Sequence, residues 1–289
     1  MRVRTAVAAA APLWVRQHLD GPRRQAIVVH TGIHAVYVAV TDGDAPRCVG
    51  VLSSRSSFVP CGMRTMWPDL SALNLNVEGL DAEGPVHGDA VTIGGGVLEI
   101  GPASVRIGRT VDASVPALDA MAAGVMADLL RSVVAGREAS VRSELLPASL
   151  VLLEAGDPAA VGMLLGRGSG LTPVGDDVLA GWLAVTAAAR PGPPCSVAHE
   201  VAEKANQATT LLSATLLDRA VSGDVLPEFR DLLVHLQMFA TSGEPGQVGT
   251  SGDRVLAIGH TSGIGMLLGC LIALDHLTQI HPTARNPRT

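Results

Sequence analysis

The chain has 289 residues, which is enough for one large domain or two of modest size. Hydrophobic residues make up 47% of it and aromatic residues only 2%, so a core must be built mainly from Ala, Val and Leu. The formal net charge of -6 and the lack of aromatic platforms argue against a partner that is a nucleic acid or an anionic membrane.

The first residues are weakly similar to a signal peptide. Met1–Arg4 is basic and an alanine-rich stretch follows, but Pro12 interrupts the apolar run and no clean cleavage site comes after it. We therefore expect a first helix or an extended segment there, in a cytoplasmic protein.

Residues 25–109 are typical of a β-rich region. Short β-branched runs recur in this stretch, and three consecutive glycines at 94–96 are a hairpin signal. We predict a small antiparallel sheet or barrel over residues 1–113.

The rest of the chain, residues 114–289, is expected to be mostly helical. Apolar residues recur there at helical spacing. The expected helices cover residues 117–136, a short stretch from 157, and then 176–189, 197–221, 227–240 and 261–277. The segment 242–252 is expected to be an ordinary surface loop, with a mobile lid as the alternative. The apolar run 263–274 is too short to cross a membrane and is expected to lie in a buried helix. The predicted fold class is α+β, with the N-terminal β region packed on the C-terminal helical region.

Four cysteines are spread along the chain without a CxxC pair. This spacing indicates reduced, mostly buried thiols in a cytoplasmic protein, and it does not favour a zinc site or a disulfide framework. The cysteines are Cys48, Cys61, Cys195 and Cys270.

The segment Gly166 to Asp177, GRGSGLTPVGDD, is the strongest candidate for a binding site. Glycine lets backbone N–H groups approach a ligand closely, and a loop before a helix presents unpaired donors to an anion. Arg167 can add a charged fork and Thr172 a hydroxyl. The predicted anion-binding residues of this loop are Arg167, Gly168, Ser169, Gly170 and Thr172.

The two aspartates at the end of this loop lead into an apolar helix. The plainer interpretation is a tight glycine turn, with Asp176 or Asp177 as the helix cap. A second aspartate entering a core is harder to explain in that way, because a buried charge is costly unless it is paired. The free aspartate would bind a cation or a substrate amide, or orient a base. Mg²⁺ is the one cofactor considered, and no metal site is assigned.

A second glycine-containing loop, Gly259–Gly263, precedes the last apolar helix. His260 can donate to an anion, accept a proton or bind a metal, although a lone histidine at a helix start is more often a capping or packing residue. Thr261 and Ser262 can cap the helix or contact a ligand. Between the two loops, Thr210 and Ser213 are three residues apart on an expected helix, where they close the site or bond to their own helix.

These strings resemble one family. LGRGSGLTPVGDDVLAGWLA, ATTLLSATLL and AIGHTSGIGMLLGCLIAL occur in the order and spacing of the AllH family, over about residues 164–274. One departure is Val174, where the family usually has a small polar residue. The resemblance implies a subunit of oxamate carbamoyltransferase in anaerobic allantoin breakdown, which works with two other subunits and passes a carbamoyl group from oxalurate to phosphate.

The leading hypothesis is therefore an AllH-like component of a carbamoyl-transfer system that binds a small anionic carbonyl or phosphate compound. Asp176, Asp177 and His260 are the predicted catalytic residues, and Thr210, Thr261 and Ser262 join the loop residues in binding. Partner subunits or a homo-oligomer are expected, without nucleic acid or membrane. The alternatives are a non-catalytic binding subunit, and a carboxylase or lyase acting on a related acid.

Overall fold

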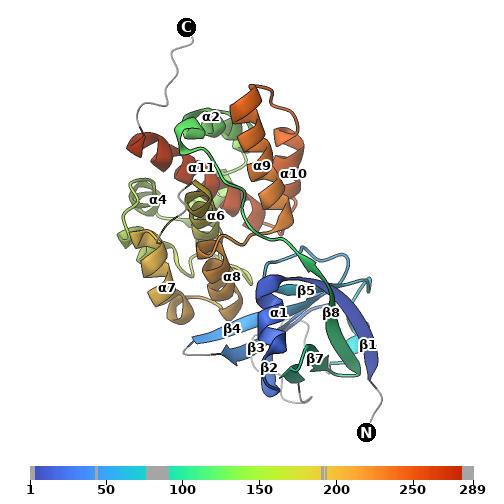
Figure 1. The fold of residues 1–289 in the computed structure, drawn as a ribbon. Coiled ribbons are helices and arrows are strands. Elements are labelled where there is room, and N and C mark those ends of the chain that lie inside the picture. The colour runs from blue at the N-terminus through green and yellow to red at the C-terminus, as the bar shows by residue number, and fades with distance from the viewer. Residues whose placement is uncertain (1–3, 43–44, 76–90, 190–191, 193, 282–289) are drawn as a thin grey trace. The chain divides into compact units, whose positions relative to one another are not determined.

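The computed structural model describes residues 4–42, 45–75, 91–189, 192 and 194–281 (Figure 1). The chain divides into two compact units, Met1–Asp112 and Ala113–Thr289. The first unit contains a closed β-barrel and the second is built of helices. The predicted α+β fold class is confirmed.

The barrel has the strand order β1-β5-β4-β3-β2-β6-β7-β8 and closes by pairing β8 with β1. Neighbouring strands in the barrel are antiparallel, except for the parallel pairs β1 with β8 and β4 with β5. Inward-facing Val, Ile, Leu, Ala and Met side chains fill it, and helix α1 (Leu13–Asp20) adds Val15 and Leu19 to the same core. The strands are β1 Thr5–Pro12, β2 Arg24–Thr31, β3 Ala35–Asp42, β4 Ala45–Leu52, β5 Gly62–Thr65, β6 Val91–Gly94, β7 Val97–Ile100 and β8 Ala103–Val111.

Strand β1 has an alanine-rich sequence with a low intrinsic preference for strands. It is nevertheless extended, because it pairs with β8 along its whole length and with β5 at Ala9 and Ala10. Val7, Ala9 and Ala11 alternate into the barrel and are at most 7% exposed. Of the two expectations for this segment, the extended one is correct up to Pro12, and a helix follows.

The glycine hairpin predicted at 94–96 is present. Gly94 pairs with Val97 across a two-residue turn, so that β6 and β7 are directly connected. Gly95 and Gly96 have φ values of 63° and 79°, a combination that glycine adopts without steric strain.

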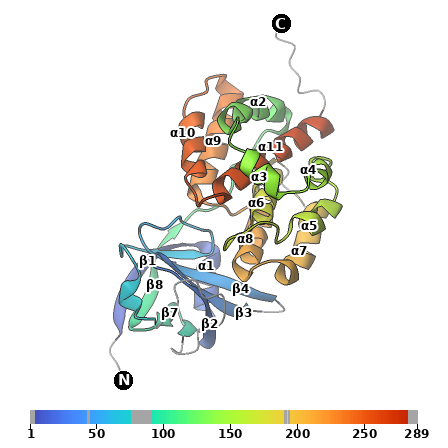
Figure 2. The same cartoon turned by 180° about the vertical axis from the view of Figure 1, so that it is seen from behind.

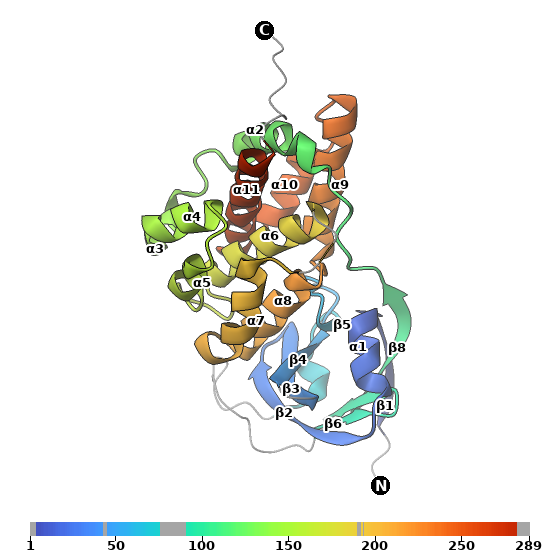
Figure 3. The same ribbon diagram turned by 60° about the vertical axis from the view of Figure 1, so that its left-hand side comes forward.

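The helical unit is organised around two apolar helices, α6 and α11, which contact each other extensively (Figures 2 and 3). Helices α2, α4 and α10 contact α11, and α5 and α8 contact α6. The helices are α2 Ala123–Val134, α3 Ala139–Glu144, α4 Pro147–Glu154, α5 Ala159–Leu164, α6 Val174–Ala189, α7 Ser196–Ala208, α8 Leu211–Val221, α9 Pro227–Ser242, α10 Val248–Leu256 and α11 Ser262–Ile280, with short 3-10 turns at Ser71–Leu73 and Ala120–Ala122.

Glycines set the separation of α6 and α11. A Cβ on Gly181 would lie 2.1 Å from the carbonyl oxygen of Met266, and a Cβ on Gly269 would lie 2.0 Å from that of Val178. Real Cβ atoms do not approach backbone so closely, so only glycine permits this crossing. The two backbones can therefore contact each other without intervening side chains.

The structure corrects three details of the helix prediction. The helix expected over 197–221 is two helices, α7 and α8, which are interrupted at Thr209 and Thr210. Part of the loop expected at 242–252 belongs to α10. The last helix, expected over 261–277, covers Ser262–Ile280, and by length and composition alone these 19 residues could cross a membrane.

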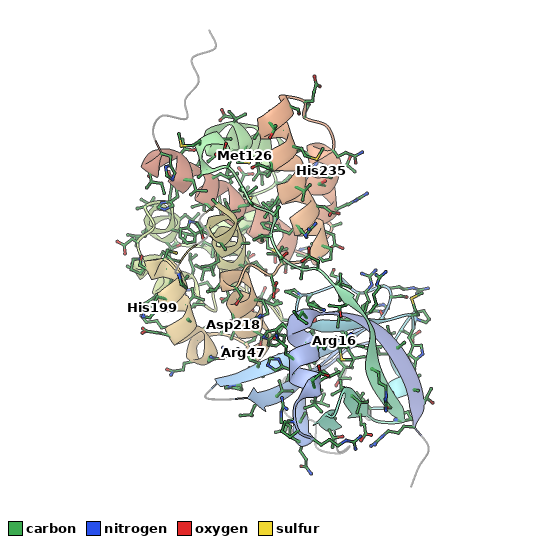
Figure 4. The ribbon with its side chains drawn as sticks, viewed as in Figure 1. Arg16, Arg47, Met126, His199, Asp218 and His235 are labelled. Atoms are coloured by element: carbon green, nitrogen blue, oxygen red, sulfur yellow. The ribbon has the colours of Figure 1, made fainter. Side chains whose placement is uncertain are left out.

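Burial nevertheless marks α11 as a core helix. In its most apolar 18-residue window, 78% of the residues are buried inside the protein. The neighbouring helix α2 extends this core, since its Met126 is only 1% exposed (Figure 4). Helix α9 is joined to α10 by a hydrogen bond of 2.5 Å between His235 and Ser251. The expectation of a buried helix is correct, and the helix is longer than its apolar run 263–274.

The glycine crossing can be tested with Gly181→Ala and Gly269→Ala. We expect each substitution to lower the free energy of unfolding by about 2 kcal/mol or more, because a carbonyl of the facing helix must move. Gly162→Ala is the matched control, since Gly162 is also helical and a Cβ there meets nothing within 4 Å. The control should be neutral or stabilise by about 0.5 kcal/mol. Equal effects for all three substitutions in urea unfolding would contradict the packing argument.

Candidate functional site

The glycine-rich loop joins α5 to α6 and is folded back on itself. The N–H of Gly175 donates to the carbonyl of Arg167 at 2.9 Å, and the N–H of Arg167 donates to the carbonyl of Leu164 at 3.0 Å. Gly168 and Gly170 have φ values of 100° and 102°, which L side chains rarely adopt. The loop conformation therefore depends on these glycines.

Asp176 is buried and holds two other segments in place. Its Oδ1 accepts a 2.8 Å hydrogen bond from the N–H of Gly166, and its Oδ2 accepts one from the hydroxyl of Thr209. Burial raises the pKa of this carboxyl, while the hydrogen bonds from Thr209 and Gly166 oppose the rise. The carboxyl thus connects the loop to the break between α7 and α8.

Asp177 is 6% exposed and lies beside two hydroxyl groups. The hydroxyl of Thr172 is 3.5 Å from its Oδ2. Burial raises the pKa of Asp177 to about 8, with a further contribution from the charge of Asp176, while Ser262 and Thr172 lower it. At neutral pH this carboxyl is therefore mostly protonated and can donate a hydrogen bond.

Neither aspartate caps α6, contrary to the simpler of the two sequence interpretations. The helix begins at Val174, so both residues lie inside its first turn. Their N–H groups donate to the carbonyl of Pro173, at 3.0 Å from Asp176 and 3.2 Å from Asp177. Because the side chains are not used for capping, they are available to bond other segments.

The two glycine loops meet through a pair of hydroxyls. The Oγ1 of Thr172 and the Oγ of Ser262 are 3.0 Å apart. The close packing of α6 and α11 brings them together, since a Cβ on Gly265 would lie 2.9 Å from the Cβ of Asp177. Thr172, Ser262 and Asp177 therefore form one polar cluster at the start of both helices.

The third motif segment reaches the same loop through Thr210. Its hydroxyl donates to the carbonyl of Leu171 at 2.9 Å and accepts a hydrogen bond from the N–H of Ser213 at 3.1 Å. Thr210 thus caps α8 and also holds the glycine-rich loop through a hydrogen bond. The prediction left open whether Thr210 closes the site or bonds to its own helix, and its hydroxyl bonds both to the glycine-rich loop and to α8.

The other predicted residues make no hydrogen bond to this cluster among the described contacts. Arg167, Gly168, Ser169 and Gly170 are exposed on the loop, and His260 is exposed before α11. Thr261 contributes its carbonyl to the first hydrogen bond of α11, from the N–H of Gly265.

Sequence reasoning missed the roles of Thr209 and Gly166 as partners of Asp176. Adjacent β-branched threonines inside an expected helix were the available signal, because β-branched residues favour helices less than alanine or leucine.

Metal binding by side chains alone is not supported in the described part of the chain. No group of three or more His, Cys, Asp or Glu residues there could hold an ion. Asp176 and Asp177 would hold Mg²⁺ only together with water or ligand oxygens, which is how that ion is often bound.

The fold and the site together define an α+β protein in which three loop segments of a helical unit converge on two buried aspartates. The family model described as oxamate carbamoyltransferase subunit AllH matches residues 164–274, which include all three segments. The match confirms the resemblance to the AllH family over this stretch. No curated protein and no solved structure matches the chain.

The raised pKa of Asp177 predicts a stability that depends on pH. The carboxyl has a pKa of about 8 in the folded protein and an ordinary value near 3.8 when exposed. The folded protein therefore holds this proton more tightly than the unfolded chain does, and protonation of Asp177 stabilises the fold. The stabilisation is complete below about pH 4 and is lost as pH rises toward 8. In the Asp177→Asn variant the side chain of residue 177 is uncharged at every pH, so this pH-dependent loss of stability should be absent.

Urea unfolding from pH 5 to pH 8 measures this difference. Relative to Asp177→Asn, the wild type should lose up to about 4 kcal/mol over this range. Asp176, whose pKa is also raised, is present in both proteins, so the comparison isolates the effect of residue 177 and its coupling to Asp176. Asp128→Asn, at a side chain that is 83% exposed, is the surface control and should keep the wild-type slope. Parallel slopes for wild type and Asp177→Asn would show that Asp177 is already charged in the folded protein.

Proposed function

We propose that this chain is the AllH-like component of a carbamoyl-transfer system and that it binds a small anionic carbonyl compound of the oxamate or oxalurate type at the Thr172–Asp177–Ser262 cluster. The observation that supports this proposal is the convergence of the three motif segments on the two buried aspartates. The family match covers the same segments.

The ligand chemistry follows from the protonation of Asp177. A neutral carboxyl donates a hydrogen bond to a carboxylate or carbonyl oxygen without repelling an anion, and the half-buried hydroxyls of Thr172 and Ser262 add two more polar contacts. The exposed N–H groups of Gly168 to Gly170 and the guanidinium of Arg167 supply the positive potential that an anion needs. The site therefore favours a small anion that also carries a carbonyl or amide group.

Asp177 also has a place in the transfer chemistry. When a carbamoyl group passes from oxalurate to hydrogen phosphate, the bond between the carbamoyl carbon and the oxamate nitrogen breaks and a carbon–oxygen bond to phosphate forms. The departing nitrogen takes up the proton that phosphate loses. A neutral Asp177 can give its proton to that nitrogen and recover one from phosphate.

Catalysis by this chain requires more than the cluster itself. His260 is the predicted group that polarises the carbonyl or carries a proton, and its exposed position before α11 leaves it able to face a ligand or a partner chain. The matching family is described as a subunit. We therefore propose that binding belongs to this chain and that partner subunits complete the transfer site.

The pH dependence of oxamate binding tests the role of Asp177. Oxamate stays a monoanion from pH 6 to pH 9, so a change in affinity reports on the protein. We expect a constant dissociation constant below about pH 7 and a tenfold weakening per pH unit above pH 8, because the charged carboxylate repels the ligand. Isothermal titration calorimetry of the full chain measures this profile.

Two variants sharpen this experiment. Asp177→Asn should bind with no such pH dependence, and Thr172→Val should weaken oxamate binding about tenfold through loss of a hydroxyl contact. Thr186→Val is the control, since Thr186 bonds only to its own helix among the described contacts. The proposal is refuted if the wild-type chain binds none of oxamate, oxalurate, phosphate and carbamoyl phosphate, with or without Mg²⁺.

A further inference from the structure

A cavity of about 630 Å³ lies within the helical unit, apart from the aspartate cluster. It is bordered by the middle of α6, the first turn of α7, the last turns of α11 and the ends of neighbouring loops, and it is partly open to solvent. Figure 4 labels His199 on α7, one residue after the turn that borders the cavity. This volume is in the range of small-molecule sites in proteins.

Trp182 lines this cavity and carries a buried donor without a partner in the described part of the chain. The residue is 1% exposed and lines the cavity, and its indole Nε1 has no hydrogen-bond partner among the described residues. A buried indole N–H normally bonds to an acceptor, because leaving it unpaired costs free energy. A ligand acceptor in the cavity would supply that missing partner.

The first turn of α7 presents further donors. Its N-cap, Cys195, makes no side-chain capping bond, and the first helical hydrogen bond runs from the N–H of His199 to the carbonyl of Cys195. The N–H groups of residues 196–198 therefore precede the helical ladder, and Ser196 and Ala198 line the cavity. The start of a helix also carries a partial positive charge, which favours a bound anion.

The remaining lining is apolar or neutral. It contains no Asp, Glu, Lys or Arg among the described residues, so no carboxylate there would repel an anion. Val115, Leu183, Ala187 and Val221 provide an apolar wall. The cavity thus combines hydrogen-bond donors on one side with a surface that suits hydrocarbon groups.

His276 holds the indole in position. Its Nδ1 donates to the carbonyl of Glu154 at 2.9 Å, and its ring centroid is 5.6 Å from that of Trp182. The ring fits because residue 156 is glycine, where a Cβ would lie 2.6 Å from the Cε1 of His276. The orientation of the donor is therefore fixed before a ligand arrives.

We infer that this cavity is a second ligand site, which binds a small organic carboxylate with an apolar body between the Trp182 indole N–H and the first turn of α7. The site shares no lining residue with the Thr172–Asp177–Ser262 cluster and does not depend on the function proposed for that cluster.

Cys195 provides a reporter for the test. It lines the cavity and is partly exposed, whereas Cys48, Cys61 and Cys270 are buried, so a mild alkylating reagent should modify Cys195 first. Benzoate is the probe and benzyl alcohol is the uncharged control of similar size. We expect benzoate to slow the alkylation of Cys195 in the full-length protein in a saturable way, with benzyl alcohol at least tenfold weaker. Peptide mass spectrometry identifies the modified cysteine.

Substitutions then separate the two groups of donors. Trp182→Phe removes the N–H and keeps an aromatic ring, and should weaken benzoate protection about tenfold or more, while Trp67→Phe in the barrel unit should not. Ser196→Pro removes one backbone N–H at the first position of α7, where proline is well tolerated. The extended backbone of Cys195, with φ -73° and ψ 171°, accepts a following proline. Ser196→Ala keeps the N–H and should protect as the wild type does.

Three results would overturn this inference. They are no protection of wild-type Cys195 by benzoate, equal protection by benzyl alcohol, and unchanged protection in both Trp182→Phe and Ser196→Pro. If Trp182→Phe is poorly folded by circular dichroism, the comparison of Ser196→Pro with Ser196→Ala decides the matter. Asp177→Asn should leave benzoate protection unchanged, which separates this site from the function proposed above.

Discussion

The close crossing of α6 and α11 is the constraint on which the candidate site depends. Glycines at 181 and 269 let the two backbones touch, and Gly265 places the start of α11 against Asp177. Any larger residue at these positions would separate the helices and, with them, the hydroxyls of Thr172 and Ser262. The small residues of the apolar helices thus have a geometric purpose beyond filling a core.

The second level of organisation is the burial of two neighbouring carboxyls. Asp176 is bonded by Gly166 and Thr209, so it has a structural role in holding the loop. Asp177 has weaker partners and a more strongly disturbed pKa, which makes it the better candidate for chemistry. Adjacent residues of one type therefore have different tasks, because their surroundings differ.

The sequence predicted the classes of element better than their connections. The glycine hairpin at 94–96 and the buried last helix follow from local chemistry and are present. Strand β1 could not be read from its alanines, since its conformation comes from pairing with β8, and the break at Thr209 depends on a bond to Asp176. In the site, residue types at the loops indicated polar chemistry, but only the packing of α6 against α11 shows which hydroxyl meets which carboxyl.

The parallel pairing of β1 with β8 has a consequence for synthesis of the chain. Within the barrel, β1 leaves the ribosome before the other strands and is closed by β8, so the barrel cannot be completed until residue 111 has emerged. Until then β5 is the partner of β1 among the described strands, and the other edge of β1 is open. Long-range pairing of this kind forms slowly, so the nascent β region must avoid association with other chains during that interval.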